Sequence, residues 1–209
     1  MEFFPQIILS LNPSLDSVII YYSSSSASKY SASIKYDVAS AAEANRSLLE
    51  EALSYYQNHK DQFSNHRFMA VLEFNKHSAK SRFYIINLNK MAVIGAYHVA
   101  HGKGSDPDND GYATYFSNQP GSEASSLGVY KTGDIYSAKW GVALRLHGLS
   151  PTNSNVYRRG IVIHPSLYVK EANVKPGRSF GCMAFDYKVS GDVINMLRGG
   201  GFIYAKYIR

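Results

Sequence analysis

The pattern of apolar residues changes at about residue 66, from a helical repeat before it to short strand-like runs after it. Between residues 41 and 58 they recur every three to four positions, which is the repeat of an amphipathic helix. The apolar face would consist of Leu48, Leu49, Ala52, Leu53 and Tyr56. Ser40 and Glu43 precede this face at the spacing of a capping box, so the helix is expected to begin at about residue 41. We expect its apolar face to pack against the core.

After residue 67 the pattern changes to short runs rich in β-branched and aromatic residues, which is typical of strands. Three such runs, at 68–74, 82–88 and 91–99, are separated by short polar turns. They predict a meander of three neighbouring strands. The segment 112–139 that follows is rich in turn residues, and we expect it to form loops that build the walls of a groove.

The last third of the chain predicts further strands and a second helix. Residues 142–146 alternate apolar and polar, and 160–163 are almost all apolar and end in His164. Ser190 stands where it would cap a short helix, and the run 202–208 predicts a closing strand. The elements together predict a mainly β, α+β fold of mostly antiparallel strands with two helices.

Residues 1–36 have the weakest pattern. Residues 18–22 predict a strand, which belongs either to a small appendage or to the main sheet. No apolar run is long enough to span a bilayer. The first residues do not have the form of a signal peptide, because Glu2 is acidic and Pro5 interrupts the apolar stretch. An envelope protein with this sequence would have lost its leader or would use another export route.

Composition narrows the class of protein. With 45% hydrophobic and 18% charged residues among 209, the chain is globular and long enough for a sizeable core. The net charge of +6 is spread along the chain without a dense basic cluster, so no nucleic-acid partner is expected. The single cysteine excludes an intrachain disulfide, and the seven histidines form no zinc motif. No metal or cofactor is expected.

Two loops have the composition of ligand sites but lack the required spacing. The stretch 101–104 is glycine-rich and contains a lysine, yet it has neither the full phosphate-loop spacing nor a following helix. The acidic loop 105–111 resembles a calcium loop only superficially, because no glutamate stands at the closing position. Neither loop is assigned a ligand.

The single cysteine stands in a motif that suits nucleophilic catalysis. Cys182 follows Gly181, and Ser179 stands two residues before that glycine. A thiol needs a base to become the reactive thiolate, and His164 at the end of an apolar run is the candidate. A lone cysteine is more often a small buried hydrophobic residue, so Cys182 alone does not establish the chemistry.

The order of His164, a linker and Ser179-x-Gly181-Cys182 resembles the catalytic signature of the murein L,D-transpeptidases, cysteine enzymes that remodel peptidoglycan. Further blocks resemble one branch of that family and occur in its order: 101–105, 116–122, 125–128, 144–149 and 177–179. The resemblance covers about residues 67 to 209. It departs from the family at Pro165, where glycine is usual, and at Met183, where this branch usually has proline.

The resemblance implies a compact β-sandwich with an N-terminal helix and a short C-terminal helix. It divides the chain into an N-terminal extension, 1–66, and a catalytic domain, 67–209. It implies that Cys182 attacks the L,D bond of a peptidoglycan stem peptide and forms a thioester. An amine acceptor would make the protein an L,D-transpeptidase, and water would make it an L,D-carboxypeptidase. It also implies a place in the cell envelope or periplasm.

Roles for the remaining site residues follow from the same motif. His164 is the expected base, and the amides of Gly181 and Cys182 are expected to face the developing oxyanion. Ser179 is expected to order the turn. If His164 activates the thiol, the pKa of Cys182 should lie well below the free-cysteine value of about 8.5.

Substrate contacts are expected from side chains around the motif. Arg178 is a candidate for holding a substrate carboxylate with its planar fork. His147 begins a turn and is a candidate for lining the site. The candidate groove walls are Tyr112, Tyr115 and Trp140.

Two other classes of function stay open at this point. A sortase-like cysteine transpeptidase also places histidine before cysteine on a β scaffold. It would need an arginine that faces the thiol, for which Arg198 is the candidate, and the Ser-x-Gly-Cys motif argues against it. The other class is a catalytically silent module that binds the cell wall. Thiol-labelling kinetics separate these classes, because a silent module has an inert cysteine.

Overall fold

The computed structural model describes residues 7–10, 17–22, 31–36 and 44–208. Its strands join in one sheet in the order β1-β2-β3-β6-β5-β4-β11-β7-β8-β9-β10. The strands are β1 Ile7–Ser10, β2 Ser17–Tyr22, β3 Ser31–Tyr36, β4 Phe68–Glu73, β5 Phe83–Asn87, β6 Ala92–Tyr97, β7 Gly128–Ala138, β8 Gly141–Gly148, β9 Val162–Ser166, β10 Met183–Asp186 and β11 Phe202–Lys206. The helices are α1 Arg46–Asn58 and α2 Tyr187–Leu197, with short 3-10 turns at η2 Lys60–Gln62 and η3 Lys103–Ser105.

Most neighbouring strands are antiparallel, as expected. The parallel pairs in the described sheet are β3 with β6, β4 with β11, and β9 with β10. Strands β4, β5 and β6 form the expected meander. The described strands β1 to β3 extend the same sheet from the edge of β6, so the strand expected at 18–22 is added to the main sheet.

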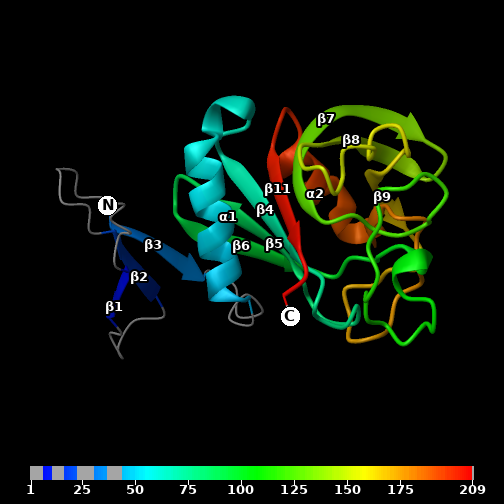
Figure 1. Ribbon diagram of the computed structural model, residues 1–209, viewed down its shortest axis with the longest axis horizontal. Helices are drawn as coiled ribbons and strands as arrows, with labels where there is room; N and C mark the ends of the chain where they lie inside the picture. The colour runs from blue at the N-terminus through cyan, green and yellow to red at the C-terminus, as the bar shows by residue number, and fades with distance from the viewer. Residues whose placement is uncertain (1–6, 11–16, 23–30, 37–43, 209) are drawn as a thin grey trace.

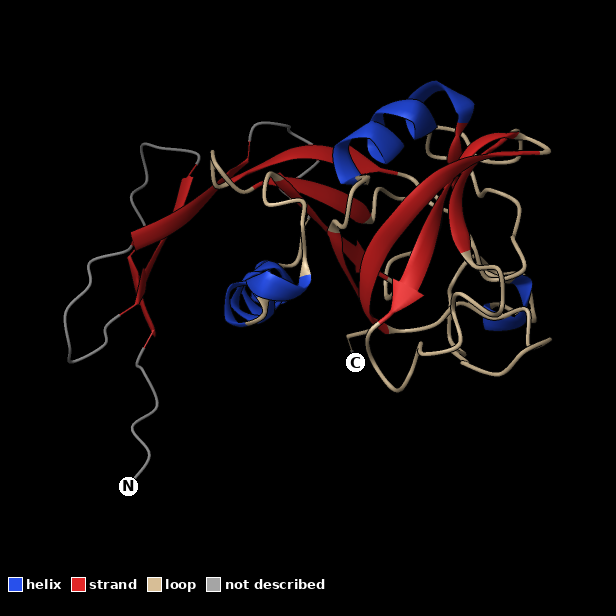
Figure 2. Cartoon of the chain, turned by 90° about the horizontal axis from the view of Figure 1, so that it is seen from above, coloured by secondary structure: helices blue, strands red, loops and turns tan. Residues whose placement is uncertain are grey.

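The central strands are buried on both faces, because successive side chains point alternately into two different cores. Along β4, Met69 and Val71 belong to one core cluster, whereas Ala70 and Leu72 belong to the other. The first core is closed by α1 and the second by α2 together with β7 to β10. Figure 1 shows α1 in front of the meander, and Figure 2 shows the two helices on opposite sides of it. The apolar runs in β4 and β5 follow from this double burial.

The expected fold class is confirmed: the protein is mainly β with an N-terminal helix and a short C-terminal helix. The strands β4 to β6 on one side of the second core and β7 to β10 on the other are joined through β11, which pairs with both β4 and β7. They therefore form one continuous sheet. No helix among the described residues is long and apolar enough to cross a membrane. The division of the chain at residue 66 stays a prediction.

Helix α1 begins later than expected. Its first residue is Arg46, and Asn45 caps it by accepting a hydrogen bond at Oδ1 from the amide of Leu48 at 3.1 Å. The expected capping box of Ser40 and Glu43 lies outside the described residues. The expected apolar face is buried as a whole: Leu48, Leu49, Ala52, Leu53 and Tyr56.

Three other expectations were wrong in detail. The segment expected to form loops up to residue 139 contains the long strand β7, whose pairing with β8 and β11 overrides its turn-rich composition. The strand around His164 continues to Ser166, because its parallel partner β10 extends alongside it. Helix α2 starts at Tyr187 and is capped by Asp186, so Ser190 lies inside the helix.

Candidate active site

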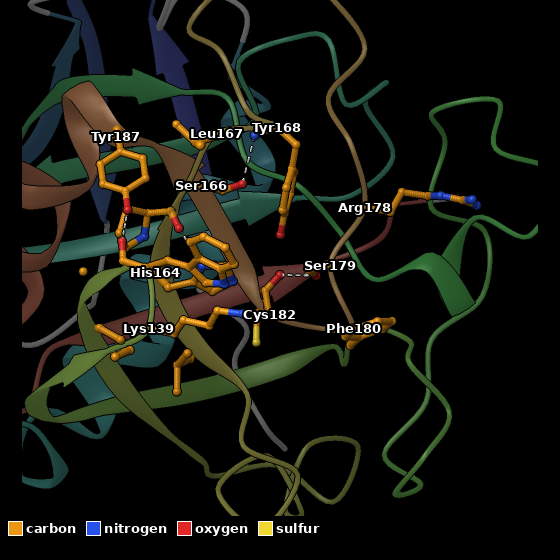
Figure 3. Close-up of a pocket in the computed structure, with 16 residues that line it drawn as sticks. Lys139, His164, Ser166, Leu167, Tyr168, Arg178, Ser179, Phe180, Cys182 and Tyr187 are labelled. Carbon is orange, nitrogen blue, oxygen red and sulfur yellow. Dashed lines mark hydrogen bonds between the residues drawn. The ribbon is translucent and has the colours of Figure 1, made fainter.

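The parallel pair β9 and β10 brings the cysteine and the histidine to one surface. Cys182 directly precedes β10, and Ala184 of β10 pairs with His164 of β9. Because side chains alternate along a strand and paired residues share a face, Cys182 and His164 lie on the same face of the sheet. Both side chains line a cavity of about 450 Å³, and Figure 3 shows the residues around it.

The walls of this cavity are mainly apolar and aromatic. Exposed large side chains surround its mouth: Trp140, Leu167, Tyr168, Phe180 and Tyr187. The Tyr187 hydroxyl donates to the carbonyl of Trp140, and the ammonium of Lys139 lies 4.6 Å from the Trp140 ring. Of the three expected wall residues, only Trp140 lines the cavity, and Tyr112 packs edge-on against His77 instead.

The ring of His164 is held by its own strand. Its Nδ1 lies 2.8 Å from the carbonyl oxygen of Pro165, so Nδ1 is the nitrogen that carries the proton. Nε2 is then left to accept a proton. Burial lowers the pKa of His164, and the hydrogen bond to Pro165 offsets part of this effect. The imidazole is therefore neutral near neutral pH.

Cys182 is also affected by burial, in the opposite direction. Burial raises the pKa of the thiol, while the amide of Val162 and the guanidinium of Arg159 lower it in part. The direction is the reverse of the expected low pKa. At rest the two groups are a thiol and a neutral imidazole.

The turn before the thiol is fixed by glycine and serine. Gly181 has a φ of +114°, and a Cβ there would lie 2.7 Å from the carbonyl oxygen of Ala124. The amide of Gly181 donates to Ser179 Oγ at 3.1 Å, and Ser179 Oγ donates to the carbonyl of Cys182 at 2.7 Å. Ser179 thus orders the turn. The Gly181 amide is already engaged, contrary to the expectation that it faces the oxyanion.

The two expected substrate contacts are placed differently, and Arg178 is among the residues that line the cavity. The Arg178 guanidinium donates to the backbone carbonyl of Asp106, and Figure 3 shows its side chain extending away from Cys182. His147 does not line the cavity; it stacks on Tyr157 with ring centroids 5.0 Å apart. The partner of Arg178 lies 72 positions away in the sequence.

A buried charged network supports the turn from behind. Arg82 is fully buried and its Nη2 donates to His101 Nδ1 at 2.9 Å, so His101 Nε2 carries the proton and donates to Asp106 Oδ2 at 3.1 Å. The carbonyl of His101 accepts the amide of Ser179 at 2.8 Å. This network links the glycine-rich stretch at 101–104 to the cysteine turn, which is a structural use of that stretch.

The acidic loop places three carboxylates together. One oxygen from each of Asp106, Asp108 and Asp110 lies within 4.8 Å of the others, so these residues are the group that could hold a cation. Asp106 already accepts hydrogen bonds from His101 and from the amides of Asp110 and Gly111. The loop has a structural role without any ion.

Sequence reasoning missed two residues beside the thiol. Tyr168 lines the cavity, and the charge of a Cys182 thiolate would raise the pKa of its hydroxyl, after the larger effect of burial. Arg159 lies on the other side of the turn, with Nη2 3.3 Å from the position of a Gly181 Cβ. Tyr168 and Arg159 both lie in loop sequences that have no helical or strand repeat, so no pattern singled them out. The position of Arg159 directly before the apolar run that leads to His164 was the available signal.

Comparison with known proteins gives one family for most of the chain. The family model described as the L,D-transpeptidase catalytic domain matches residues 40–206. No curated protein sequence matches.

Several solved structures resemble the chain at low identity. An L,D-transpeptidase from Mycobacterium smegmatis is 11% identical with a TM-score of 0.44, over 67% of this chain and 58% of that one. L,D-transpeptidase 1 of Mycobacterium tuberculosis is 11% identical with a TM-score of 0.38, over 67% and 61%. The helical cell shape determining protein Pgp2 from Campylobacter jejuni is 13% identical with a TM-score of 0.44, over 77% and 55%. The chain spans less than two thirds of each.

Proposed function

The chain belongs to the L,D-transpeptidase catalytic domain family, and from this premise we propose that it is a cysteine acyl transferase acting on peptidoglycan stem peptides. Cys182 is the proposed nucleophile and His164 the proposed base. The observation that carries the proposal is their shared position on one face of the β9–β10 pair, at one apolar cavity. The proposed place of action is the cell envelope.

In the proposed first step, His164 Nε2 takes the proton of the Cys182 thiol as the sulfur attacks the carbonyl carbon of an L,D bond. The resulting oxyanion collapses and the C–N bond to the terminal D-residue breaks. His164 returns the proton to the departing amine, and a thioester on Cys182 remains. The Nδ1–H bond to Pro165 supports this role, because it orients the ring and keeps Nε2 available.

We assign the backbone contact to the oxyanion to the amide of Cys182. The Gly181 amide donates to Ser179 Oγ, so it would join only after that hydrogen bond opens. Ser179 contributes by holding the turn through the carbonyl of Cys182. A donor aimed at the developing charge contributes about 3 kcal/mol in comparable sites.

In the second step an amine or water attacks the thioester. The amine would form a cross-link and water would release a shortened stem. The aromatic walls around Cys182 favour an extended acyl chain over free access of water, which supports the transpeptidase. The hydrolytic activity is the competing outcome at the same thioester.

The proposal is tested by incubating the protein with purified muropeptides and weighing the products. We expect loss of a terminal D-residue together with cross-linked dimers. Cys182→Ala should abolish both products, and His164→Ala should reduce both strongly. A carbapenem should add once per chain at Cys182, since a strained lactam offers its carbonyl to the same thiol. A protein that alkylates with iodoacetamide but takes neither substrate nor carbapenem would have a reactive thiol without an acyl-transfer site, which contradicts the proposal.

The sortase-like alternative receives less support. Its candidate arginine, Arg198, is the exposed C-cap of α2 and does not line the cavity. A different arginine, Arg159, lies near the thiol, but the family match favours the L,D-transpeptidase. A silent wall-binding module would show no product in the muropeptide assay.

A further inference from the structure

Arg159 carries a positive charge that no carboxylate balances. Its Nη1 donates to the carbonyl of Ser117 and to Ser126 Oγ, both at 2.7 Å. Its Nη2 donates to the carbonyl of Ala124 at 2.6 Å and to Ser122 Oγ at 3.1 Å. All four acceptors are neutral, and none of the ion pairs among residues 44–208 involves Arg159.

The same guanidinium lies against the turn that presents the thiol. Its Nη2 is 3.3 Å from the position that a Cβ on Gly181 would take, so the guanidinium lies close to the backbone of that turn. The next residue along the chain, Gly160, has its carbonyl oxygen 3.7 Å from Cys182 Sγ. Arg159 is half-buried, so water screens its charge less than it would screen a surface arginine.

We propose that Arg159 is a positioning residue whose fixed charge stabilises the thiolate of Cys182. The inference deepens the proposed function and rests on Cys182 being the nucleophile. Arginine is suited to this task, because it stays protonated and its planar fork is locked by the loop 117–126.

The other groups around the thiol do not supply this charge at rest. His164 is kept neutral by burial, since its pKa is lowered. Tyr168 is neutral near neutral pH, and Lys139 places its ammonium over the Trp140 ring. Arg178 also lines the cavity, but its guanidinium donates to the carbonyl of Asp106. Burial lowers the pKa of Arg159 and raises the pKa of the Cys182 thiol, and the charge of each group offsets part of the effect of burial on the other. Arg159 thus opposes the burial that raises the pKa of the thiol.

The experiment measures the pH dependence of Cys182 alkylation by iodoacetamide in the full chain. A nearby opposite charge lowers the pKa of an acidic group by about one unit or more. Arg159→Gln should therefore raise the midpoint of Cys182 alkylation by about one unit. At a pH below both midpoints that is about tenfold slower alkylation. Arg159→Lys keeps the charge and should stay close to the wild-type midpoint. The neighbouring Arg158 is exposed, so Arg158→Gln is the matched control and should change nothing.

Each outcome decides the proposal. An unchanged midpoint in Arg159→Gln would overturn it. Equal shifts of the alkylation midpoint in Arg159→Lys and Arg159→Gln would also overturn it. Both variants lose the planar guanidinium that holds the loop 117–126, so an equal effect would come from the loop and not from the charge. If Arg159→Gln does not fold, Arg159→Lys alone still tests the idea, since a midpoint raised by about one unit despite the retained charge contradicts it. Alkylation needs no stem peptide. A failed muropeptide assay would therefore refute the proposed function, whereas the alkylation midpoints alone decide the inference about Arg159.

Discussion

Burial shifts the pKa values of Cys182 and His164 in opposite directions, and in the proposed function these two groups exchange one proton. The pKa of the thiol is raised and that of the imidazole is lowered, so a thiolate–imidazolium pair is disfavoured before substrate arrives. General-base transfer during attack is the chemistry that such a pair favours.

His164→Ala should therefore separate two measurements. Acyl transfer should fall by about 10²- to 10⁴-fold, because the base is lost. The midpoint of Cys182 alkylation should move little, because a neutral imidazole contributes no charge to the resting thiol. Kinetics on muropeptides and iodoacetamide labelling check the two effects. A midpoint that lies far below the free-cysteine value and rises in the variant would mean that the ion pair exists at rest.

Gly181→Ala should destabilise the protein by about 2–5 kcal/mol, from left-handed strain and overpacking. The added methyl group would lie 2.7 Å from both the carbonyl oxygen of Ala124 and Cδ1 of Ile161. Denaturant unfolding measures the effect. Gly191→Ala is the matched control, because no atom lies within 4 Å of its Cβ position in α2, and it should be neutral or stabilising by up to about 1 kcal/mol. Equal effects at the two sites would refute the steric account.

His101 should make stability depend on pH. Its pKa is lowered to about 4 by burial first and then by Arg82, with Asp106 opposing. The unfolded chain therefore binds a proton in the window from about pH 6.5 to pH 4 while the folded protein does not. The contribution of neutral His101 to the free energy of unfolding is therefore fully present above that window, and it is lost as the pH falls through the window.

The expected loss between about pH 7 and pH 5 is about 2 kcal/mol. Unfolding in urea at the two pH values measures it in the wild type and in His101→Gln. The variant should lose this part of the pH dependence, although its stability at pH 7 will also fall. An identical slope in both proteins would show that another group titrates in this window.

At the scale of elements, the junction of β10 and α2 connects the site to the core. Asp186 ends β10 and caps α2 by accepting the amide of Lys188 at Oδ1, while Oδ2 accepts the amide of Glu171 at 3.1 Å. One carboxylate thus joins the strand after Cys182, the helix behind it and the loop that follows His164.

Asp186→Ala should cost about 1–2 kcal/mol of stability, because both amides lose a charged acceptor. Ser190→Ala is the comparison, since Ser190 lies inside α2 and its hydroxyl contacts only the carbonyl of Tyr187 at 3.4 Å. That change should lie within about 0.5 kcal/mol of zero. Thermal unfolding of both variants checks the order. A larger loss at Ser190 would restore it as the cap.

At the scale of the whole molecule, α1 closes one of the two cores. Its buried face covers Met69 and Val71 of β4 and Phe202 of β11. Glu51 adds polar contacts to β11, with Lys206 Nζ at 2.6 Å and the Tyr204 hydroxyl at 2.7 Å. The strands β4 and β11 of this sheet therefore depend on a helix that precedes both of them in the chain.

Two truncations test where the catalytic domain begins. Removal of residues 1–66 should expose the α1-covered face and leave a protein that aggregates or unfolds far more easily, because burial of that face is lost. Removal of 1–43 should cost much less, since the described strand β3 joins β6 through only two residue pairs. Solubility and thermal melting measure both. A stable piece 67–209 would confirm the boundary predicted at residue 66.

Local patterns determined much of this protein. The β-branched and aromatic runs of the meander, the helical repeat of α1 and the spacing of Ser179, Gly181 and Cys182 lie within short stretches, so they can be recognised from the sequence alone. They predict the mainly β class, the buried face of α1 and the candidate cysteine with its histidine. The family resemblance at these blocks is matched by the family model over residues 40–206.

Only the tertiary structure decided what each polar side chain does. Arg178 bonds to Asp106, 72 positions away, and Arg159 bonds to Ser117, 42 positions away. No local repeat records such pairs, so neither contact was predicted from the sequence, and the substrate role of Arg178 stays a prediction. The strand β7 and the pKa directions of Cys182 and His164 were also decided there, because pairing and burial depend on segments that meet only after the chain has folded.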